Sequence, residues 1–175
     1  MIEHFTEAII LKQKNIGEFD KLIYLYAKEL GKVVVKAKSS RKITSKLASQ
    51  LEPLNIVKVR LIEKNGFQIA DSMIFKKIEK SLKTIEIADF IEEMTFELQP
   101  DRKLWIEIKK SFENINKGNF SYNKLLEILG FSRDFAECAN CQSRRVNFFS
   151  KKEQVFLCKR CGLKNRGNDL ILINP

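Results

Sequence analysis

Four cysteines near the C-terminal end of the chain form two Cys-x2-Cys pairs. Cys138 is paired with Cys141 and Cys158 with Cys161, and 16 residues separate the two pairs. Two thiolates on one tight turn can reach the same ion, so two such turns supply the four sulfur ligands of a closed tetrahedral site. The spacing predicts one structural Zn²⁺ that holds a small module together and has no coordination position open for catalysis.

The residues between the two pairs favour a zinc ribbon. VNFF (146–149) and QVFL (154–157) resemble strands, and residues 150–153 suit the polar tip of a hairpin. Iron in a rubredoxin-like site and disulfides are the alternatives. Disulfides are disfavoured because nothing in the sequence indicates export from the cell.

A second pattern lies in GKVVVKAKSSRKITSKLAS (31–49), where an alternating strand leads into a basic loop. Alternate residues of a strand share a face, so the lysines should line one side while the valines and alanine between them enter a core. No Asp or Glu occurs between Glu29 and Glu52. Such a surface suits a row of phosphate groups. The residues predicted to contact nucleic acid are Lys32, Lys36, Lys38, Arg41, Lys42 and Lys46, together with Arg144 and Arg145 near the cysteines.

The charge distribution supports a polyanionic partner. The net charge is +10, and the excess of Lys and Arg is concentrated in residues 1–80 and 138–175, whereas residues 81–137 are slightly acidic. Two separate basic regions favour nucleic acid as the partner. An acidic protein, a membrane surface or a merely solvated surface are the alternatives.

Few residues offer enzyme chemistry. The single histidine, His4, is expected on a frayed N-terminus, and Glu92 and Glu93 point about 100° apart if they lie on a helix. No glycine-rich phosphate loop or serine elbow occurs. We therefore predict a protein that is not an enzyme.

The first 75 residues predict five short strands, at 6–14, 19–29, 32–38, 55–64 and 67–75. The last two flank Asn65-Gly66, the strongest short signal for a hairpin. Five strands in so short a stretch predict a five-stranded OB-type barrel, with an SH3-like barrel as the alternative. The side chains considered for base stacking are Phe67, Tyr24 and Tyr26, although the core is the expected place of each.

From about Lys77 the apolar period becomes helical. One predicted stripe consists of Ile87, Ile91, Met94 and Leu98, and a second, after Pro100, of Leu104, Ile108, Phe112 and Ile115. Ser121 is expected to cap a third helix, with Leu125, Leu126 and Leu129 facing inward before Gly130 ends it. The predicted fold is α+β: a barrel at 1–76, a small helical domain at 77–136 and a zinc ribbon with its tail at 137–175. Without a signal peptide or a membrane span, a soluble cytoplasmic protein is expected.

The sequence resembles the RecO family of bacterial recombination mediators. The segments that carry the resemblance are, in order, TEAIILK (6–12), GEFDKLIYLY (17–26), GKVVVKAKSSRK (31–42), LEPLNIVKVRL (51–61) and LLEILGF (125–131), followed by the cysteine pairs. Members of the family typically continue with further helices after the zinc module. Here 14 residues follow Cys161, so the resemblance is to a short form.

The resemblance implies a protein of DNA repair and recombination. It implies binding to single- and double-stranded DNA, annealing of complementary strands, and loading of recombinase onto DNA coated by single-strand binding protein. The implied partners are RecR and single-strand binding protein. The implied location is the bacterial cytoplasm, at the nucleoid. An adaptor that binds RNA or acts in transcription, built from the same barrel and ribbon, is the alternative function.

Overall fold

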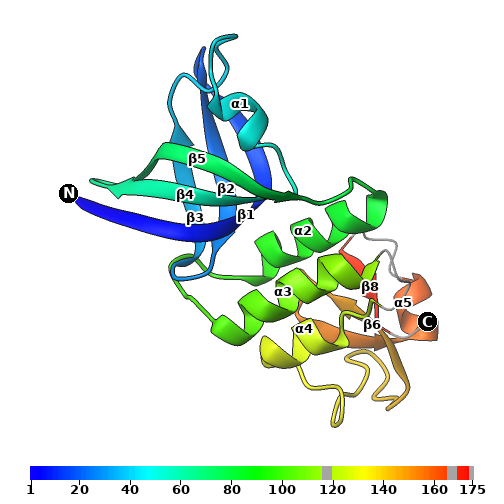
Figure 1. Cartoon of the computed structure of the whole chain (residues 1–175). Helices are drawn as coiled ribbons and strands as arrows, with labels where there is room; N and C mark the ends of the chain where they lie inside the picture. The colour runs from blue at the N-terminus through cyan, green and yellow to red at the C-terminus, as the bar shows by residue number, and fades with distance from the viewer. Residues whose placement is uncertain (116–119, 165–168, 174–175) are drawn as a thin grey trace. The chain divides into compact units, whose positions relative to one another are not determined.

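The computed structural model describes residues 1–115, 120–164 and 169–173 (Figure 1). The chain forms two compact units, residues 1–105 and 106–175, and the boundary falls inside a helix. Both strands and helices occur, so the predicted α+β class is confirmed. The division into three domains, at 1–76, 77–136 and 137–175, stays a prediction.

Five strands of the first unit close into a barrel in the order β1-β2-β3-β5-β4. The strands are β1 (Ile2–Ile16), β2 (Asp20–Ala27), β3 (Gly31–Ala37), β4 (Asn55–Glu63) and β5 (Phe67–Lys77). Neighbours pair antiparallel, except that β3 and β5 close the barrel in parallel through two residue pairs, Val35 with Phe67 and Lys36 with Gln68. The short helix α1 (Leu47–Gln50) lies between β3 and β4. This is the predicted OB-type barrel, and the SH3-like alternative is set aside.

Local sequence explains much of the barrel. Val33, Val35 and Ala37 are buried in its core. The residues on the other face of the strand, Lys32, Val34 and Lys36, are half-buried, as the alternation predicts. The turn between β4 and β5 has positive φ at Asn65 (51°) and Gly66 (111°), the conformation that an Asn-Gly hairpin turn requires. Pattern and turn chemistry therefore agree over this region.

The expectation of a frayed N-terminus around His4 is wrong. Residues 2–5 are the first part of β1 and pair with residues 60–63 of β4. His4 Nε2 lies 2.8 Å from Glu63 Oε2, and its ring centroid is 5.7 Å from that of Phe67. Pairing with residues 55 to 61 positions further along the chain holds this segment in place, and local sequence does not reveal such a partner.

Helix α2 (Leu82–Met94) begins with a capping box, in which Ser81 and Thr84 each accept the other's backbone N–H. Ile87, Ile91 and Met94 are buried on one stripe, as predicted. The prediction that Leu98 continues this stripe is wrong, because the helix ends at Met94 and Leu98 is 53% exposed with φ 55°. The Leu98 N–H donates to the carbonyl of Lys32, so a contact with β3 draws the chain out of the helix.

The chain between α2 and α3 (Arg102–Ile115) lies tightly against the turn that joins β2 and β3. Gly31 has φ +72°, and a Cβ there would lie 2.4 Å from the carbonyl oxygen of Gln99, so only glycine fits. Asp101 then caps α3 by accepting the N–H groups of Lys103 and Leu104. The Asp101 N–H donates to the Tyr26 hydroxyl, which fixes the start of α3 on the barrel.

The helices after Pro100 largely follow the predicted pattern. Of the second stripe, Leu104, Ile108 and Phe112 are buried and Ile115 is half-buried. In α4 (Asn123–Ile128), Leu125 and Leu126 are buried and Leu129 just beyond the helix is half-buried. The N-cap residue is Tyr122 and not the predicted Ser121, although Ser121 Oγ accepts the Asn123 N–H. Gly130, at φ 92°, follows the helix end as predicted.

The C-terminal part of the second unit is a three-stranded antiparallel sheet in the order β7-β6-β8. Its elements are β6 (Val146–Ser150), β7 (Val155–Cys158), α5 (Lys159–Lys164) and β8 (Leu170–Leu172). The predicted hairpin of β6 and β7 is confirmed, whereas β8 and α5 were not predicted. Phe149 is fully buried, with its ring edge-to-face with Phe131 and Phe156. None of the helices in the described residues is long and apolar enough to cross a membrane.

Candidate metal centre and nucleic-acid interface

The four cysteines converge on one point. The sulfur atoms of Cys138, Cys141, Cys158 and Cys161 all lie within 4.8 Å of one another, and none is in a disulfide. The Sγ atoms of Cys141 and Cys158 are 3.6 Å apart. Four sulfurs about 2.3 Å from one ion at tetrahedral angles lie about 3.8 Å apart, so the cluster has the dimensions of a tetrahedral thiolate site.

Short turns position the sulfurs. The Cys138 N–H donates to the Ser143 carbonyl and the Gln142 N–H to the Cys138 carbonyl, which closes the first turn. Cys158 is the last residue of β7, and α5 begins directly after it and carries Cys161. Gly162 lies against Phe148, where a Cβ would come 2.4 Å from the ring, so this glycine lets an aromatic ring cover the cluster.

The cluster cannot easily carry four negative charges by itself. Burial disfavours the Cys138 thiolate, but hydrogen bonds from the backbone of Cys158, Asn140 and Cys141 outweigh burial and lower its pKa to about 6. A hydrogen bond with the Cys158 sulfur, burial and repulsion from its neighbours raise the pKa of Cys161 to about 12. A bound cation would remove this repulsion. The donor set thus fits a metal that prefers four thiolates, and it is compatible with Zn²⁺.

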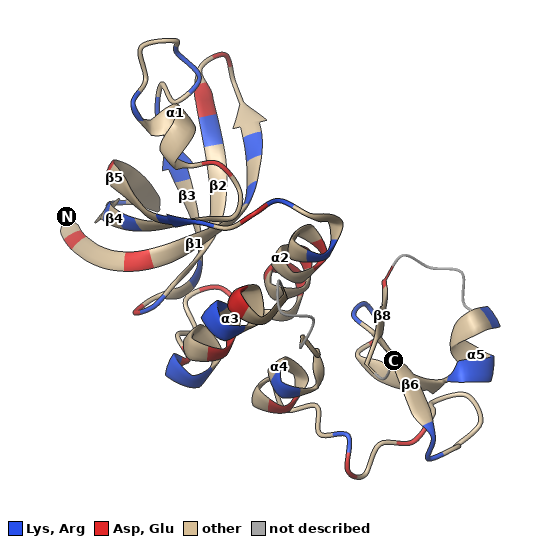
Figure 2. Cartoon of the chain, turned by 45° about the vertical axis from the view of Figure 1, so that its right-hand side comes forward, with Lys and Arg blue, Asp and Glu red and all other residues tan. Residues whose placement is uncertain are grey.

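The predicted basic residues of the barrel lie on β3 and in the loop that follows it. Figure 2 shows Lys and Arg gathered in this loop beside α1 and on the adjoining strands. Lys36 is half-buried, whereas the other predicted cations of this region and the neighbouring Ser39 are exposed, namely Lys38, Arg41, Lys42 and Lys46. The structure brings these cations to one end of the barrel, where the turn between β1 and β2 also lies.

That turn and the basic loop are tied together by four hydrogen bonds and one ion pair. Asp20 accepts the Ser39 N–H at 2.8 Å, and its other oxygen lies 2.9 Å from Lys36 Nζ. The Arg41 N–H donates to the Phe19 carbonyl, and Arg41 Nη1 donates to the carbonyls of Gly17 and Glu18. We call this set of contacts the Asp20–Arg41 clasp. These contacts give the Gly17–Lys21 segment a structural role, because they hold the basic loop in position.

The clasp should respond to acid through Asp20. The Ser39 N–H and the Lys36 ammonium hold the pKa of this carboxyl below its ordinary value of 3.8. Because the folded-state pKa is lowered, the stabilisation is complete well above pH 3.8 and disappears as the pH falls through the folded-state pKa. We expect the Asp20 carboxyl carbon to titrate below 3.8 by NMR, with the Ser39 amide shifting at the same midpoint. Asp20→Asn should abolish that shift of Ser39, and a midpoint at or above 3.8 would contradict the clasp.

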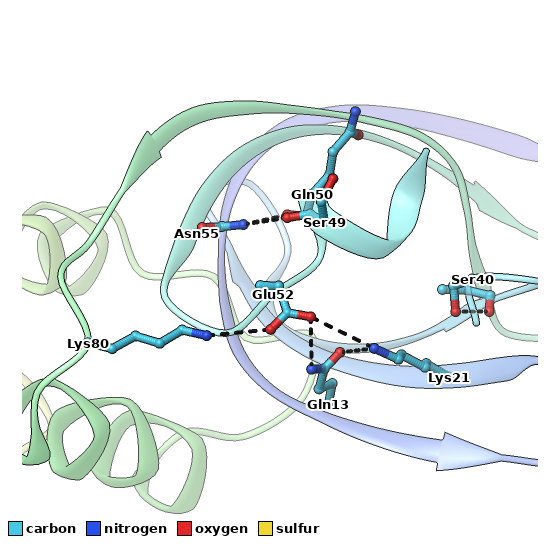
Figure 3. Close-up of polar contacts among 9 residues, drawn as sticks. Gln13, Lys21, Ser40, Ser49, Gln50, Glu52, Asn55 and Lys80 are labelled. Carbon is cyan, nitrogen blue, oxygen red and sulfur yellow. Dashed lines mark hydrogen bonds and ion pairs between the residues drawn. The ribbon is translucent and has the colours of Figure 1, made fainter. Parts of the chain in front are cut away.

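A second polar network neutralises the acidic residue at the far end of the basic loop. Glu52 accepts hydrogen bonds from Gln13 and Lys80, both at 3.4 Å, and its carboxylate lies 4.0 Å from Lys21 Nζ (Figure 3). Asn55 caps α1 by donating to the carbonyls of Ser49 and Gln50. Glu52 therefore leaves little free negative charge beside the loop.

The remaining predicted contacts are differently placed. Lys32 Nζ donates to the Glu92 carbonyl in the last turn of α2 at 2.7 Å, so this lysine holds the helix against the barrel. Tyr26 is fully buried with its ring stacked on Trp105, and Phe67 packs on the barrel core, in keeping with the expected core role of each. Tyr24 is half-buried on the outer face of β2. In the second unit Arg144 and Arg145 are exposed, and Arg144 Nε lies 3.2 Å from Glu137.

Comparison with known proteins places the chain in one family. Residues 1–94 match the model described as Recombination protein O N terminal, and residues 78–171 match Recombination protein O C terminal. A DNA repair protein RecO of Caldanaerobacter subterraneus subsp. tengcongensis is 30% identical over 173 residues, which cover 89% of this chain and 70% of that protein.

Two further relatives carry the same name. The DNA repair protein RecO of Dehalococcoides mccartyi is 29% identical, covering 89% of this chain and 69% of the relative. The DNA repair protein RecO of Bacillus subtilis is 25% identical, covering 89% of this chain and 67% of the relative. The two family models together with the first of these relatives confirm the resemblance seen in the sequence. The chain belongs to the RecO family of DNA repair proteins.

Proposed function

We propose that the protein is a mediator of DNA repair and recombination that acts without catalysing a covalent step. It binds single- and double-stranded DNA, anneals complementary strands, and helps load recombinase onto DNA coated by single-strand binding protein. RecR and single-strand binding protein are the proposed protein partners. Its place of action is then the cytoplasm, at the nucleoid.

The observation that carries the proposal is the group of cations at one end of the barrel. The cations lie on one strand and one loop and are Lys36, Lys38, Arg41, Lys42 and Lys46. Of the acidic neighbours, Asp20 is paired with Lys36 of this group, and Glu52 is engaged by Lys21 and Lys80. OB-type barrels bind single strands across the face of strands 2 and 3 and with adjoining loops. Fixed positive charge beside that face favours a phosphate backbone.

The proposed mechanism of annealing is neutralisation of two backbones. The barrel cations hold the phosphates of one strand, and the exposed Arg144 and Arg145 of the cysteine module contact those of another. Lowering the repulsion between strands lets base pairing complete the reaction. Zn²⁺ bound by Cys138, Cys141, Cys158 and Cys161 would keep the module folded and takes no part in chemistry.

Annealing of two complementary DNA strands, with and without the protein, tests the proposal. Each strand is offered naked and coated with the cognate single-strand binding protein. We expect faster annealing of both substrates. If only naked strands anneal faster, the proposed annealing of DNA is supported and the proposed action on coated DNA is contradicted. No acceleration of either, with tighter binding to RNA than to DNA of the same sequence, would replace the mediator by an RNA-binding adaptor.

A further inference from the structure

One aromatic side chain stands among the barrel cations. Phe19 lies in the turn between β1 and β2 and is 42% exposed. Lys42 Nζ lies 5.4 Å from the centre of its ring, which is within the range of a cation–π contact. An exposed ring beside a cation presents a flat apolar face next to a phosphate-binding group, and these are the two parts of a single-strand contact.

The clasp fixes the backbone that carries this ring relative to the basic loop. The Phe19 carbonyl accepts the Arg41 N–H at 2.9 Å, and the carbonyls of Gly17 and Glu18 accept from the Arg41 guanidinium at 3.2 and 2.9 Å. Asp20, the next residue, holds Ser39. Hydrogen bonds made by the residues before and after Phe19 therefore fix the backbone that carries the ring.

The aromatic residues that the sequence offered for base stacking are engaged elsewhere. Tyr26 is fully buried against Trp105, and Phe67 packs on the barrel core beside His4. Tyr24 is half-buried and lies opposite Val34 on β3. Among the described aromatic residues of β2, β3 and the loops at their ends, Phe19 has the most exposed ring.

We propose that Phe19 is a base-stacking platform for single-stranded nucleic acid, with Lys42 and Lys38 binding the phosphates on either side of the stacked base. This inference rests on the proposed DNA binding and adds to it a contact with bases. The occupant is a single strand and not a duplex, because the faces of bases in a duplex are already stacked on their neighbours. The stacking contact tolerates any base, which suits a protein that must act on any sequence.

The test compares a single-stranded oligonucleotide with an abasic one of the same length and phosphate number. The full-length protein should bind the normal strand about tenfold more tightly than the abasic strand, which is a typical effect of one stacked base. Phe19→Leu should bring the normal strand down to the affinity of the abasic strand and leave the abasic affinity unchanged. Phe19→Trp should restore the difference.

Phe96→Leu is the matched control, since Phe96 is 68% exposed in the same unit and lies outside the clasp. It should leave both affinities unchanged. Equal weakening of both oligonucleotides by Phe19→Leu would show that the ring only supports the loop and would overturn the inference. An unchanged preference of Phe19→Leu for the normal strand would also overturn the inference. In either case, binding of both oligonucleotides by the wild-type protein would leave the proposed DNA binding intact.

If the wild-type protein binds neither oligonucleotide at moderate salt, the proposed DNA binding fails and the stacking platform fails with it. Selective loss of binding to an acidic, aromatic peptide in Phe19→Leu, without any change in DNA affinity, would replace the nucleic acid by a protein partner.

Discussion

Replacing Cys158 by serine is expected to reduce bound zinc from one ion per chain to a small fraction and to unfold the cysteine module. The substitution removes one of four converging sulfurs and leaves the site unable to close. Structural zinc contributes roughly 10–16 kcal/mol of binding free energy at neutral pH, far more than the small sheet β7-β6-β8 gains from its few buried residues. A chelator added to the wild-type protein should have the same effect.

Metal content by mass spectrometry and amide hydrogen exchange in β6 and β7 measure the two consequences. Lys159→Ala provides the control, because Lys159 is exposed and lies between two ligands without offering a sulfur. It should retain both the metal and slow exchange. If the β6 and β7 amides of Cys158→Ser remain as protected as in the wild type, the metal does not hold the module. Iron in place of zinc would appear in the same measurement of metal content.

Replacing Lys36, Lys38, Lys42 and Lys46 together by alanine is expected to weaken binding to single-stranded DNA at least about tenfold near 0.1 M salt. Four neutralised phosphates give a slope of about −3 in the logarithm of affinity against the logarithm of salt concentration, and the variant should lose most of this slope. The folding midpoint should change little, because only Lys36 among the four has a described ion pair, and that pair is partly accessible to solvent.

Four other exposed lysines, Lys64, Lys77, Lys83 and Lys103, form the matched control. Replacing them removes the same total charge from other parts of the first unit. A comparable loss of affinity in this control would mean that net charge, and not the group at the end of the barrel, attracts DNA. A drop in the folding midpoint of the first variant would mark its lysines as structural.

The features that local sequence predicted well are those in which neighbouring residues carry the signal. The alternation around Val33 and Val35 fixes which side of β3 is buried, and the Asn65-Gly66 turn fixes the register of β4 and β5. The paired cysteines predicted their own convergence because a two-residue spacing leaves a chain few ways to place two sulfurs.

The features that escaped prediction depend on partners distant in the sequence. The helical period suggested that Leu98 continues α2, but the Lys32 carbonyl binds its N–H and the chain turns away. His4 lies in a strand because β4 pairs with it. Local sequence did not reveal the clasp, since Asp20 and Arg41 reach their partners only through the pairing of β1, β2 and β3. Phe19 is a single aromatic residue in a turn, and no periodicity or motif in the sequence marks it as exposed.

The way in which the barrel closes has a mechanical consequence. Strand β3 is joined to β2 by seven residue pairs but to β5 by only two, Val35 with Phe67 and Lys36 with Gln68. The pairing of β3 with β5 is therefore the weakest in the barrel. The β2–β3 hairpin is held to the other strands mainly by the pairing of β2 with β1. Tension on a DNA strand bound along β2 and β3 would act parallel to this hairpin. The force would pass to the other strands through the pairing of β2 with β1, and the two residue pairs between β3 and β5 would bear little of it.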